Sequence, residues 1–177
     1  MSEFEKSKTY ENLQKALTGE AIAHTKYQLY KSKLSDFNKG YDNILSEIIH
    51  NEKEHFEIWF KLLHNDVVPD NETNLLDAMK GEANECHNLY IEFGRTARTE
   101  GYDEIADLFF KVARIECKHR ETFKQIKTEI SDSKFYEDEK ETTEWKCLNC
   151  GYQLDGFNAP KECSVCKHPQ KYFTKEE

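Results

Sequence analysis

Four cysteines near the C-terminal end have the spacing of a metal site. They form two pairs, Cys147-x2-Cys150 and Cys163-x2-Cys166. Two such pairs supply four thiolates in tetrahedral geometry, which suits either zinc or a single iron ion. Gly151 follows Cys150 directly, at a turn position that favours a positive φ. The spacing predicts a four-cysteine metal site and leaves a structural zinc ribbon open as an alternative.

A second group of ionisable residues recurs in the two halves of the chain. Each half contains Gly-Glu-Ala and then Glu-x2-His, and the second glutamate follows the first by 32 positions in the first half and by 34 in the second. The repeated residues are Glu20, Glu52 and His55 in the first half, and Glu82, Glu116 and His119 in the second. Glu85, one helical turn after Glu82, matches Ala23 in the first half and is therefore a seventh candidate. This set is the di-metal ligand pattern of ferritin-like bundles, and its donor atoms suit iron or manganese.

These candidate ligands require helices to bring them together. Glycine is rare before residue 150 and Pro69 is the only proline there, so long helices are expected. We predict them near 4–37, 41–66, 73–99 and 102–131. The short connections after the first and third favour antiparallel neighbours and a four-helix bundle.

Apolar residues at steps of three and four predict one inward stripe on each helix, with a carboxylate near its middle. In the third helix the predicted stripe is Leu75, Met79, Glu82, Cys86, Leu89 and Phe93. A carboxylate on such a stripe costs several kcal/mol unless it is paired or binds a metal. Four stripes with a carboxylate at similar depth therefore predict a converging metal site.

Other histidines, cysteines and tyrosines fit ordinary structural roles. Glu47-x2-His50 lies about 140° around the helix from Glu52 and is predicted to be a surface pair. His24, His64 and His87 have no partner in the repeat and are predicted not to be ligands, and Cys86 and Cys117 are interpreted as plain core cysteines. Tyr27 and Tyr90, on or next to the stripes, could fill the core or donate a hydrogen bond to oxygen species bound at a di-metal site.

Charge and hydropathy narrow the function classes. The net charge is −9, and residues 145–177 carry +1, so residues 1–144 carry −10; an acidic chain of this kind does not predict a nucleic-acid surface. The sequence contains no run of about 18 apolar residues, so no membrane span is predicted. No signal peptide is evident, so a cytoplasmic location is expected. We predict a helical domain over 1–131, a polar linker over 132–144 and a small metal domain over 145–177.

Taken together, these motifs resemble the rubrerythrin family over essentially the whole sequence. The motifs that carry the resemblance are Gly19-Glu20-Ala21 with Tyr27, Glu52-x2-His55, Gly81-Glu82-x2-Glu85 with Tyr90, Glu116-x2-His119, and Cys147, Cys150, Gly151, Tyr152, Cys163, Cys166, His168 and Pro169. The chain departs from the family pattern at Ile91, where proline is common, and at Lys167, where glycine is common. Neither departure removes a candidate ligand.

The resemblance implies a mainly α fold, a ferritin-like four-helix bundle followed by a small rubredoxin-like domain with a four-cysteine metal site. It also implies a non-haem di-iron peroxidase that reduces hydrogen peroxide to water in oxidative stress defence. Glu52 and Glu116 would bridge two iron ions, and Glu82 with His119 would complete one of them. The other ion would take Glu20 and would exchange His55 for Glu85 as its redox state changes.

The resemblance further implies a third iron at the four cysteines that returns electrons singly. No Gly-x-Gly-x-x-Gly occurs in the chain, so NADH would act through a partner, such as a rubredoxin or a flavoprotein reductase. A homodimer or higher homo-oligomer is expected. The competing hypotheses are a ferritin-like ferroxidase that stores iron and a zinc-ribbon adaptor on an acidic bundle.

Overall fold

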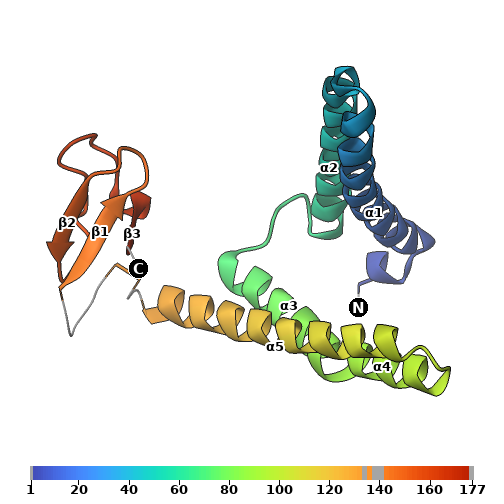
Figure 1. Ribbon diagram of the computed structural model, residues 1–177. Coiled ribbons are helices and arrows are strands. Elements are labelled where there is room, and N and C mark those ends of the chain that lie inside the picture. The colour runs from blue at the N-terminus through green and yellow to red at the C-terminus, as the bar shows by residue number, and fades with distance from the viewer. Residues whose placement is uncertain (1, 133–134, 137–141, 176–177) are drawn as a thin grey trace. The chain divides into compact units, whose positions relative to one another are not determined.

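The computed structural model describes residues 2–132, 135–136 and 142–175, and it divides the chain into two compact units after Asp70. Helices make up most of the described residues, and the strands lie in the C-terminal part (Figure 1). The mainly α prediction is therefore confirmed. Among the described residues, no helix is long and apolar enough to cross a membrane.

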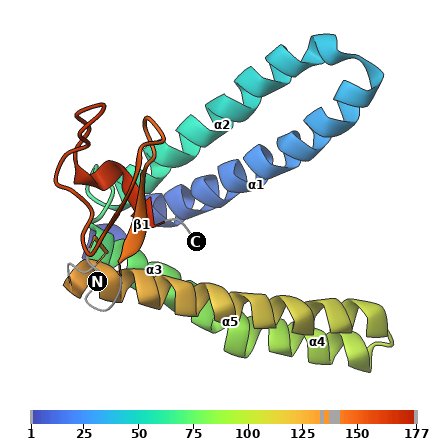
Figure 2. The same ribbon diagram turned by 60° about the vertical axis from the view of Figure 1, so that its left-hand side comes forward.

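The first unit contains a helical hairpin. Its helices are α1, Lys8–Phe37, and α2, Asp42–Leu63, with short 3-10 turns at Phe4–Lys6 and Lys39–Tyr41 (Figure 2). The Ser7 hydroxyl accepts a hydrogen bond from the Tyr10 amide at 3.1 Å and so caps the start of α1. The second helix ends earlier than predicted because Asn65 and Asp66 both have positive φ, 57° and 64°, which an α-helix cannot continue.

The second unit begins with a helix that is interrupted, where an unbroken one was predicted. It consists of α3, Asn71–Asn84, then the π-helical turn η3, Glu85–Leu89, then α4, Tyr90–Thr99. The Tyr90 amide donates to the carbonyl of Glu85, five residues earlier, as a π turn requires. A π turn holds one residue more than an α turn, so the face of every later residue shifts.

That shift changes the residues that contact α5 at the far end of the predicted stripe. The Phe93 ring, 41% exposed, lies 5.6 Å from that of Phe109 on α5, as predicted for an inward-facing residue, and the next residue, Gly94, is buried. Gly94 packs so closely on α5 that an added Cβ would lie 2.5 Å from Cε1 of Phe110. A larger residue at this position would require the Phe110 ring to move.

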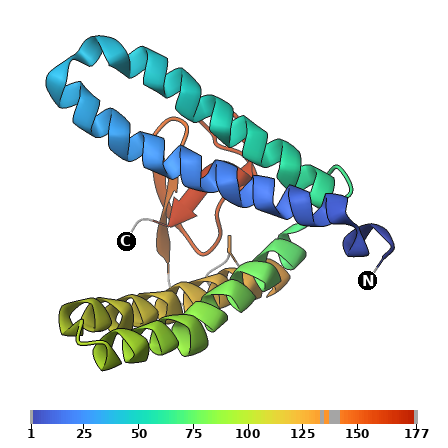
Figure 3. The ribbon, with the colours of Figure 1, turned by 90° about the vertical axis from the view of Figure 1, so that its right-hand side faces the viewer.

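The return helix of this unit is α5, Asp103–Asp132, which runs beside α3 and α4 (Figure 3). Gly101, with φ of 87°, forms the turn between α4 and α5. Ala106 and Ala113 are almost fully buried along α5, and these small side chains allow close helix contact. The Arg98 guanidinium pairs with Asp103 at 3.4 Å and also with Asp107, which closes the hairpin end.

The C-terminal module is a three-stranded antiparallel sheet in the order β2-β1-β3. The strands are β1, Thr143–Cys147, β2, Gln153–Gly156, and β3, Phe173–Lys175, with a 3-10 turn at Gln170–Tyr172 before the last. Its core is built on Trp145 and Phe173, both almost fully buried. Most of the predicted linker over 132–144 lies outside the described residues, but the Tyr136 carbonyl accepts a hydrogen bond from the Ala159 amide at 2.9 Å.

Candidate metal sites

The first carboxylate cluster consists of Glu20 on α1 and Glu52 and His55 on α2, with one donor atom from each within 4.8 Å of the others. Nδ1 of His55 lies 3.3 Å from a carboxylate oxygen of Glu52 and 3.8 Å from one of Glu20. The Trp59 indole N–H donates to Glu20 at 3.4 Å. Glu52 and His55 are three residues apart, so one face of α2 presents both toward Glu20.

The second carboxylate cluster repeats this arrangement in the second unit. It consists of Glu82 on α3 and Glu116 and His119 on α5, again with donor atoms within 4.8 Å of one another. Nδ1 of His119 lies 2.6 Å from Glu116 and 3.7 Å from Glu82. The internal repeat of the sequence therefore corresponds to a repeat in geometry, with two carboxylates and one imidazole in each cluster.

The two clusters differ in their electrostatics. A hydrogen bond with Glu52 is the main cause that lowers the pKa of Glu20, and the Trp59 indole adds to it. Burial is the main cause that raises the pKa of Glu82, and the negative charges of Glu116 and Glu85 act in the same direction. Phe123, seven residues after Glu116 as Trp59 is after Glu52, has no N–H to donate. The second cluster thus holds more uncompensated negative charge, which a bound cation would relieve.

This asymmetry predicts opposite effects of two matched substitutions on the metal-free protein. At neutral pH, Glu82→Gln should raise the melting temperature, because it removes a charge that burial and the neighbouring carboxylates disfavour. Glu20→Gln should lower the melting temperature, because the Trp59 indole N–H donates a charge-assisted hydrogen bond to the Glu20 carboxylate. Thermal unfolding followed by circular dichroism measures both changes.

The pH dependence of the two substitutions has a defined sign. The pKa of Glu82 is raised in the fold, so its ionisation costs stability as the pH rises above 4.5, the ordinary pKa of a glutamate, and the gain from Glu82→Gln should vanish below that pH. The pKa of Glu20 is lowered, so the loss from Glu20→Gln should fade only as the pH drops below 4.5. Equal shifts for the two variants would contradict the asymmetry.

Glu85, the seventh candidate, which has no counterpart in the first half of the repeat, begins the π turn and is half-buried. The Tyr90 hydroxyl hydrogen-bonds to Glu85, and burial, followed by the Glu85 charge and this bond, raises the pKa of Tyr90. The charges of Glu116 and Glu82 raise it further, so Tyr90 faces the second cluster. Tyr27 is half-buried on α1, with its ring 6.0 Å from that of Tyr30.

The histidines outside the repeat have other partners. Nδ1 of His24 lies 3.0 Å from the Ile49 carbonyl oxygen, and Nδ1 of His64 lies 2.7 Å from that of Phe60. His50 is exposed and lies 3.9 Å from Glu54. His87 contacts the sulfur of Cys86 at 3.4 Å. None of these four imidazoles joins either carboxylate cluster.

The interpretation of Cys86 and Cys117 as plain core cysteines was wrong. The structure joins them in a disulfide between η3 and α5, with their Cα atoms 5.1 Å apart. Periodicity placed both on apolar faces, but it does not reveal which residues of two helices lie opposite each other. The π turn at Cys86 makes that register harder still to predict.

The four C-terminal cysteines lie close together, with donor atoms within 4.8 Å. The sulfur atoms of Cys147 and Cys166, and those of Cys150 and Cys163, are 3.7 Å apart. A tetrahedron with metal–sulfur bonds of about 2.3 Å has edges of roughly 3.8 Å, so the sulfurs already have the spacing of a four-coordinate ion. Zinc and iron both fit this geometry.

The two cysteine knuckles share one backbone conformation. The Gly151 amide donates to the Cys147 carbonyl at 2.8 Å, and the Lys167 amide donates to the Cys163 carbonyl at 3.0 Å. Gly151 has φ of 75° and Lys167 has φ of 61°. Lysine therefore replaces the common glycine without loss of the knuckle, at a conformational cost of about 1 kcal/mol.

Protonation of the four thiols is uneven. A backbone hydrogen bond from Tyr152 lowers the pKa of Cys150, but burial and the neighbouring thiols outweigh it and raise that pKa to about 12. A backbone hydrogen bond from His168 lowers the pKa of Cys166 to about 6. Without a metal Cys150 thus retains its proton at neutral pH, and metal binding must release it.

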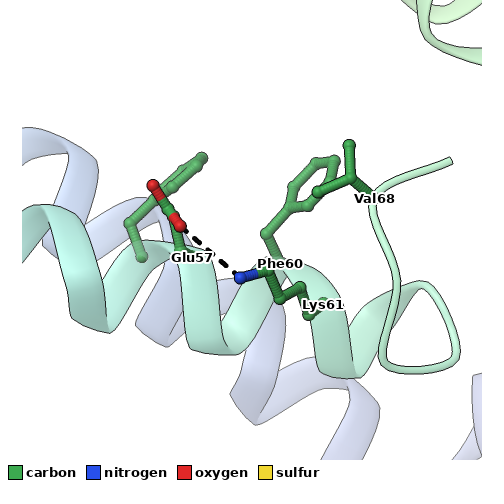
Figure 4. Close-up of a pocket in the computed structure, with 5 residues that line it drawn as sticks. Glu57, Phe60, Lys61 and Val68 are labelled. Atoms are coloured by element: carbon green, nitrogen blue, oxygen red, sulfur yellow. Dashed lines mark ion pairs between the residues drawn. The ribbon is translucent and has the colours of Figure 1, made fainter. Parts of the chain in front are cut away.

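A pocket elsewhere on α2 is not part of these sites. Its volume is 300 Å³, and its lining residues are Phe56, Glu57, Phe60, Lys61 and Val68 (Figure 4). Glu57 and Lys61 form an ion pair at 3.5 Å across its rim. The pocket contains no predicted ligand, so we assign it no role in metal binding.

Comparisons with known proteins agree with the donor sets. The family model described as rubrerythrin matches residues 11–127 and 73–147, and the model described as the rubredoxin-like domain of rubrerythrin matches residues 145–174. The chain is 36% identical to rubrerythrin of Clostridium perfringens and 34% identical to rubrerythrin-1 of Clostridium acetobutylicum, in each case over 98% of this chain and 96% of the relative. Rubrerythrin of Nitratidesulfovibrio vulgaris is 32% identical, also over 98% of this chain and 96% of the relative.

Proposed function

Since the chain belongs to the rubrerythrin family, we propose that it is a non-haem di-iron peroxidase that reduces hydrogen peroxide to water. The family has a ferritin-like helical fold and a di-iron function in oxidative stress. Its cofactors are a pair of iron ions in the bundle and one iron at the four cysteines. The chain is accordingly an oxidoreductase, and we propose that the substrate it reduces is hydrogen peroxide.

The observation that carries this proposal is the pair of matched carboxylate clusters. Each supplies two carboxylates and an imidazole from one helical hairpin, and these donors suit iron. We propose that Glu52 and Glu116 would serve both ions, and that Glu82 and His119 would help to hold one of them. Glu20, together with either His55 or Glu85, would hold the other.

When bound, a ferrous pair would supply the two electrons needed to reduce hydrogen peroxide to two water molecules, and an iron held by the four cysteines would supply single electrons in return. The chain's own residues supply the protons and the positioning. The raised pKa of Tyr90 keeps its phenol protonated, so it can donate a hydrogen bond beside Glu85. We propose the same donor role for Tyr27 on α1.

Glu85 favours peroxidase over iron storage. It makes the second cluster richer in negative charge than the first, and storage does not require a seventh carboxylate. A third carboxylate beside Glu82 and Glu116 would compensate the extra positive charge of the oxidised pair. The rubredoxin-like domain adds a second feature that storage does not require.

The electron source lies outside the chain in this proposal. We propose that a rubredoxin or a flavoprotein reductase linked to NADH donates to the four-cysteine site. We also propose a cytoplasmic homodimer or higher homo-oligomer. The test is to reduce the iron-loaded protein anaerobically with such a partner and then to add hydrogen peroxide. Oxidation of the partner on addition of peroxide would show that electrons pass along the whole route.

Substitution of Glu85 tests the proposed peroxidase cycle. Glu85→Ala should retain most ferrous iron, because the other six candidate ligands remain. Peroxide-dependent oxidation should slow by about ten-fold, the typical cost of losing a ligand or its support. Stopped-flow absorbance at matched iron content measures the rate.

Two further variants sharpen this test. Glu85→Gln keeps the side-chain shape and a hydrogen bond to Tyr90 but removes the charge, so it should behave like Glu85→Ala if charge compensation is the cause. Glu92→Ala, at an exposed position on α4, should leave the rate at the wild-type value. A wild-type rate for Glu85→Ala would favour a six-ligand, ferritin-like site.

A further inference from the structure

The Cys86–Cys117 disulfide lies next to the second carboxylate cluster in sequence and in structure. Cys86 directly follows Glu85 in the π turn, and Cys117 directly follows Glu116 on α5. The link therefore ties η3, which begins with Glu85, to α5, which carries Glu116 and His119. Nothing in the proposed iron chemistry uses these two sulfur atoms.

We propose that Cys86 and Cys117 form a reversible dithiol–disulfide site that a hydroperoxide closes and a dithiol reductant opens. The Cα atoms are 5.1 Å apart, within the range that a disulfide spans without backbone movement. The dithiol and the disulfide can therefore exchange on the same helical framework. This inference does not depend on the proposed peroxidase activity.

The hairpin does not depend on the cross-link for its geometry. Close packing of Gly94 against Phe110 and burial of Ala106 already hold α4 against α5. The ion pairs of Arg98 fasten the far end. Opening the disulfide therefore leaves the paired helices in place, which a reversible site requires.

The two sulfur atoms differ in access. Cys86 is only 3% exposed, whereas Cys117 is half-buried. A reductant thiolate can therefore reach Cys117 more easily than Cys86. Attack at Cys117 would release Cys86 into a site where the His87 imidazole contacts its sulfur at 3.4 Å.

The chemistry balances in both directions. In oxidation, one cysteine sulfur attacks the hydroperoxide, the O–O bond breaks, and a sulfenic acid and one molecule of water or alcohol form. The second cysteine then attacks the sulfenic sulfur, forms the S–S bond and releases water. In reduction, a dithiol forms a mixed disulfide with Cys117, and its second thiol displaces that sulfur, so two electrons and two protons return to the cysteines.

The closed link also constrains the π turn. Glu85 and Tyr90 bound this turn, and Cys86 lies inside it. A covalent tie from Cys86 to α5 restricts local opening of the segment that holds the seventh carboxylate. Oxidation of the Cys86–Cys117 pair would thus reduce the mobility of Glu85, and reduction of the pair would increase it.

Peptide mapping of the full-length, iron-loaded protein tests the proposal. Trypsin should release Cys86 in peptide 81–95 and Cys117 in peptide 115–118, separately from the four C-terminal cysteines. After anaerobic dithiothreitol, both peptides should be alkylated by iodoacetamide. After a small excess of hydrogen peroxide, the two should appear as one linked peptide, and a second dithiothreitol treatment should separate them again.

Variants and hydrogen exchange complete the experiment. Neither Cys86→Ser nor Cys117→Ser should give a linked peptide, and Cys86→Ser should leave Cys117, the more accessible cysteine, as a sulfenic acid that dimedone labels. Amide exchange within 81–95 should be several-fold faster in the reduced wild type than in the oxidised one, and equally fast in both treatments of Cys117→Ser. Wild-type exchange that did not change between the two states would refute the effect on the π turn.

Three results would overturn the reversible site. Both peptides could remain alkylated after peroxide, which would show that the pair does not close. The link could resist dithiothreitol in the folded protein, which would make it a fixed structural cross-link. The reduced pair could hold Zn²⁺ with His87 and give no linked peptide, which would make it a metal site.

Discussion

Turnover with an external electron donor should disappear when Cys150 is replaced by Ser, while one round of peroxide reduction survives. A serine hydroxyl is a poor substitute for a thiolate, so the four-cysteine site should lose its iron or its red charge-transfer colour. The carboxylate clusters lie on helices outside the cysteine module, so they keep all their donor atoms in this variant. Chemically reduced Cys150→Ser protein should therefore still oxidise once with hydrogen peroxide.

Visible absorption, steady-state donor oxidation and single-turnover oxidation measure these effects. Leu148→Ala is the matched control, because Leu148 lies within the same knuckle and is 66% exposed. It should keep both the colour and the turnover. Loss of the single turnover in Cys150→Ser would show that the two kinds of iron site do not function separately. A colourless wild-type protein that binds zinc would instead favour the adaptor hypothesis.

Replacement of His119 by Ala should lower iron occupancy or peroxide reactivity by about ten-fold or more. Nδ1 of His119 lies near both Glu116 and Glu82, so its removal leaves the second cluster without its nitrogen donor. His50→Ala should stay near the wild type, because His50 is exposed and lies near Glu54 only. Iron analysis and stopped-flow oxidation at matched protein concentration compare the two.

These two histidines share the same local motif, a glutamate three residues earlier. The comparison therefore tests the face of the helix and not the motif. Similar losses from both variants would contradict the assignment of His119 and, with it, the repeat that pairs His119 with His55. His55→Ala, from the other half of the repeat, should resemble His119→Ala.

Much of the fold and the candidate site could be predicted because periodicity and spacing act locally. The repeated carboxylates and Glu-x2-His pairs lie on long helices, and i, i+3 geometry alone brings Glu52 to His55 and Glu116 to His119. The two Cys-x2-Cys knuckles are local for the same reason. Each of these predictions needed only the next helical turn or the next few residues.

The features that sequence reasoning missed depend on contacts between segments or on a change of helical pitch. The π turn at Glu85 adds one residue without any Gly or Pro to mark it, so the third helix was predicted as unbroken. The hydrogen bond from Trp59 to Glu20 crosses from α2 to α1, and the Cys86–Cys117 link depends on the register between η3 and α5. A stripe analysis assigns such residues to the core but does not reveal their partners.

The two tryptophans place an intrinsic fluorophore beside each kind of metal site. Trp59 donates to Glu20 in the first carboxylate cluster, and Trp145 is fully buried in the core that also contains Cys147 and Cys163. The chain has two tryptophans in total, so each kind of metal site has one indole beside it. An enclosed indole emits at shorter wavelengths than one that water can reach, and nearby iron quenches either. Intrinsic fluorescence can therefore follow the filling of the two kinds of site separately, without any added dye.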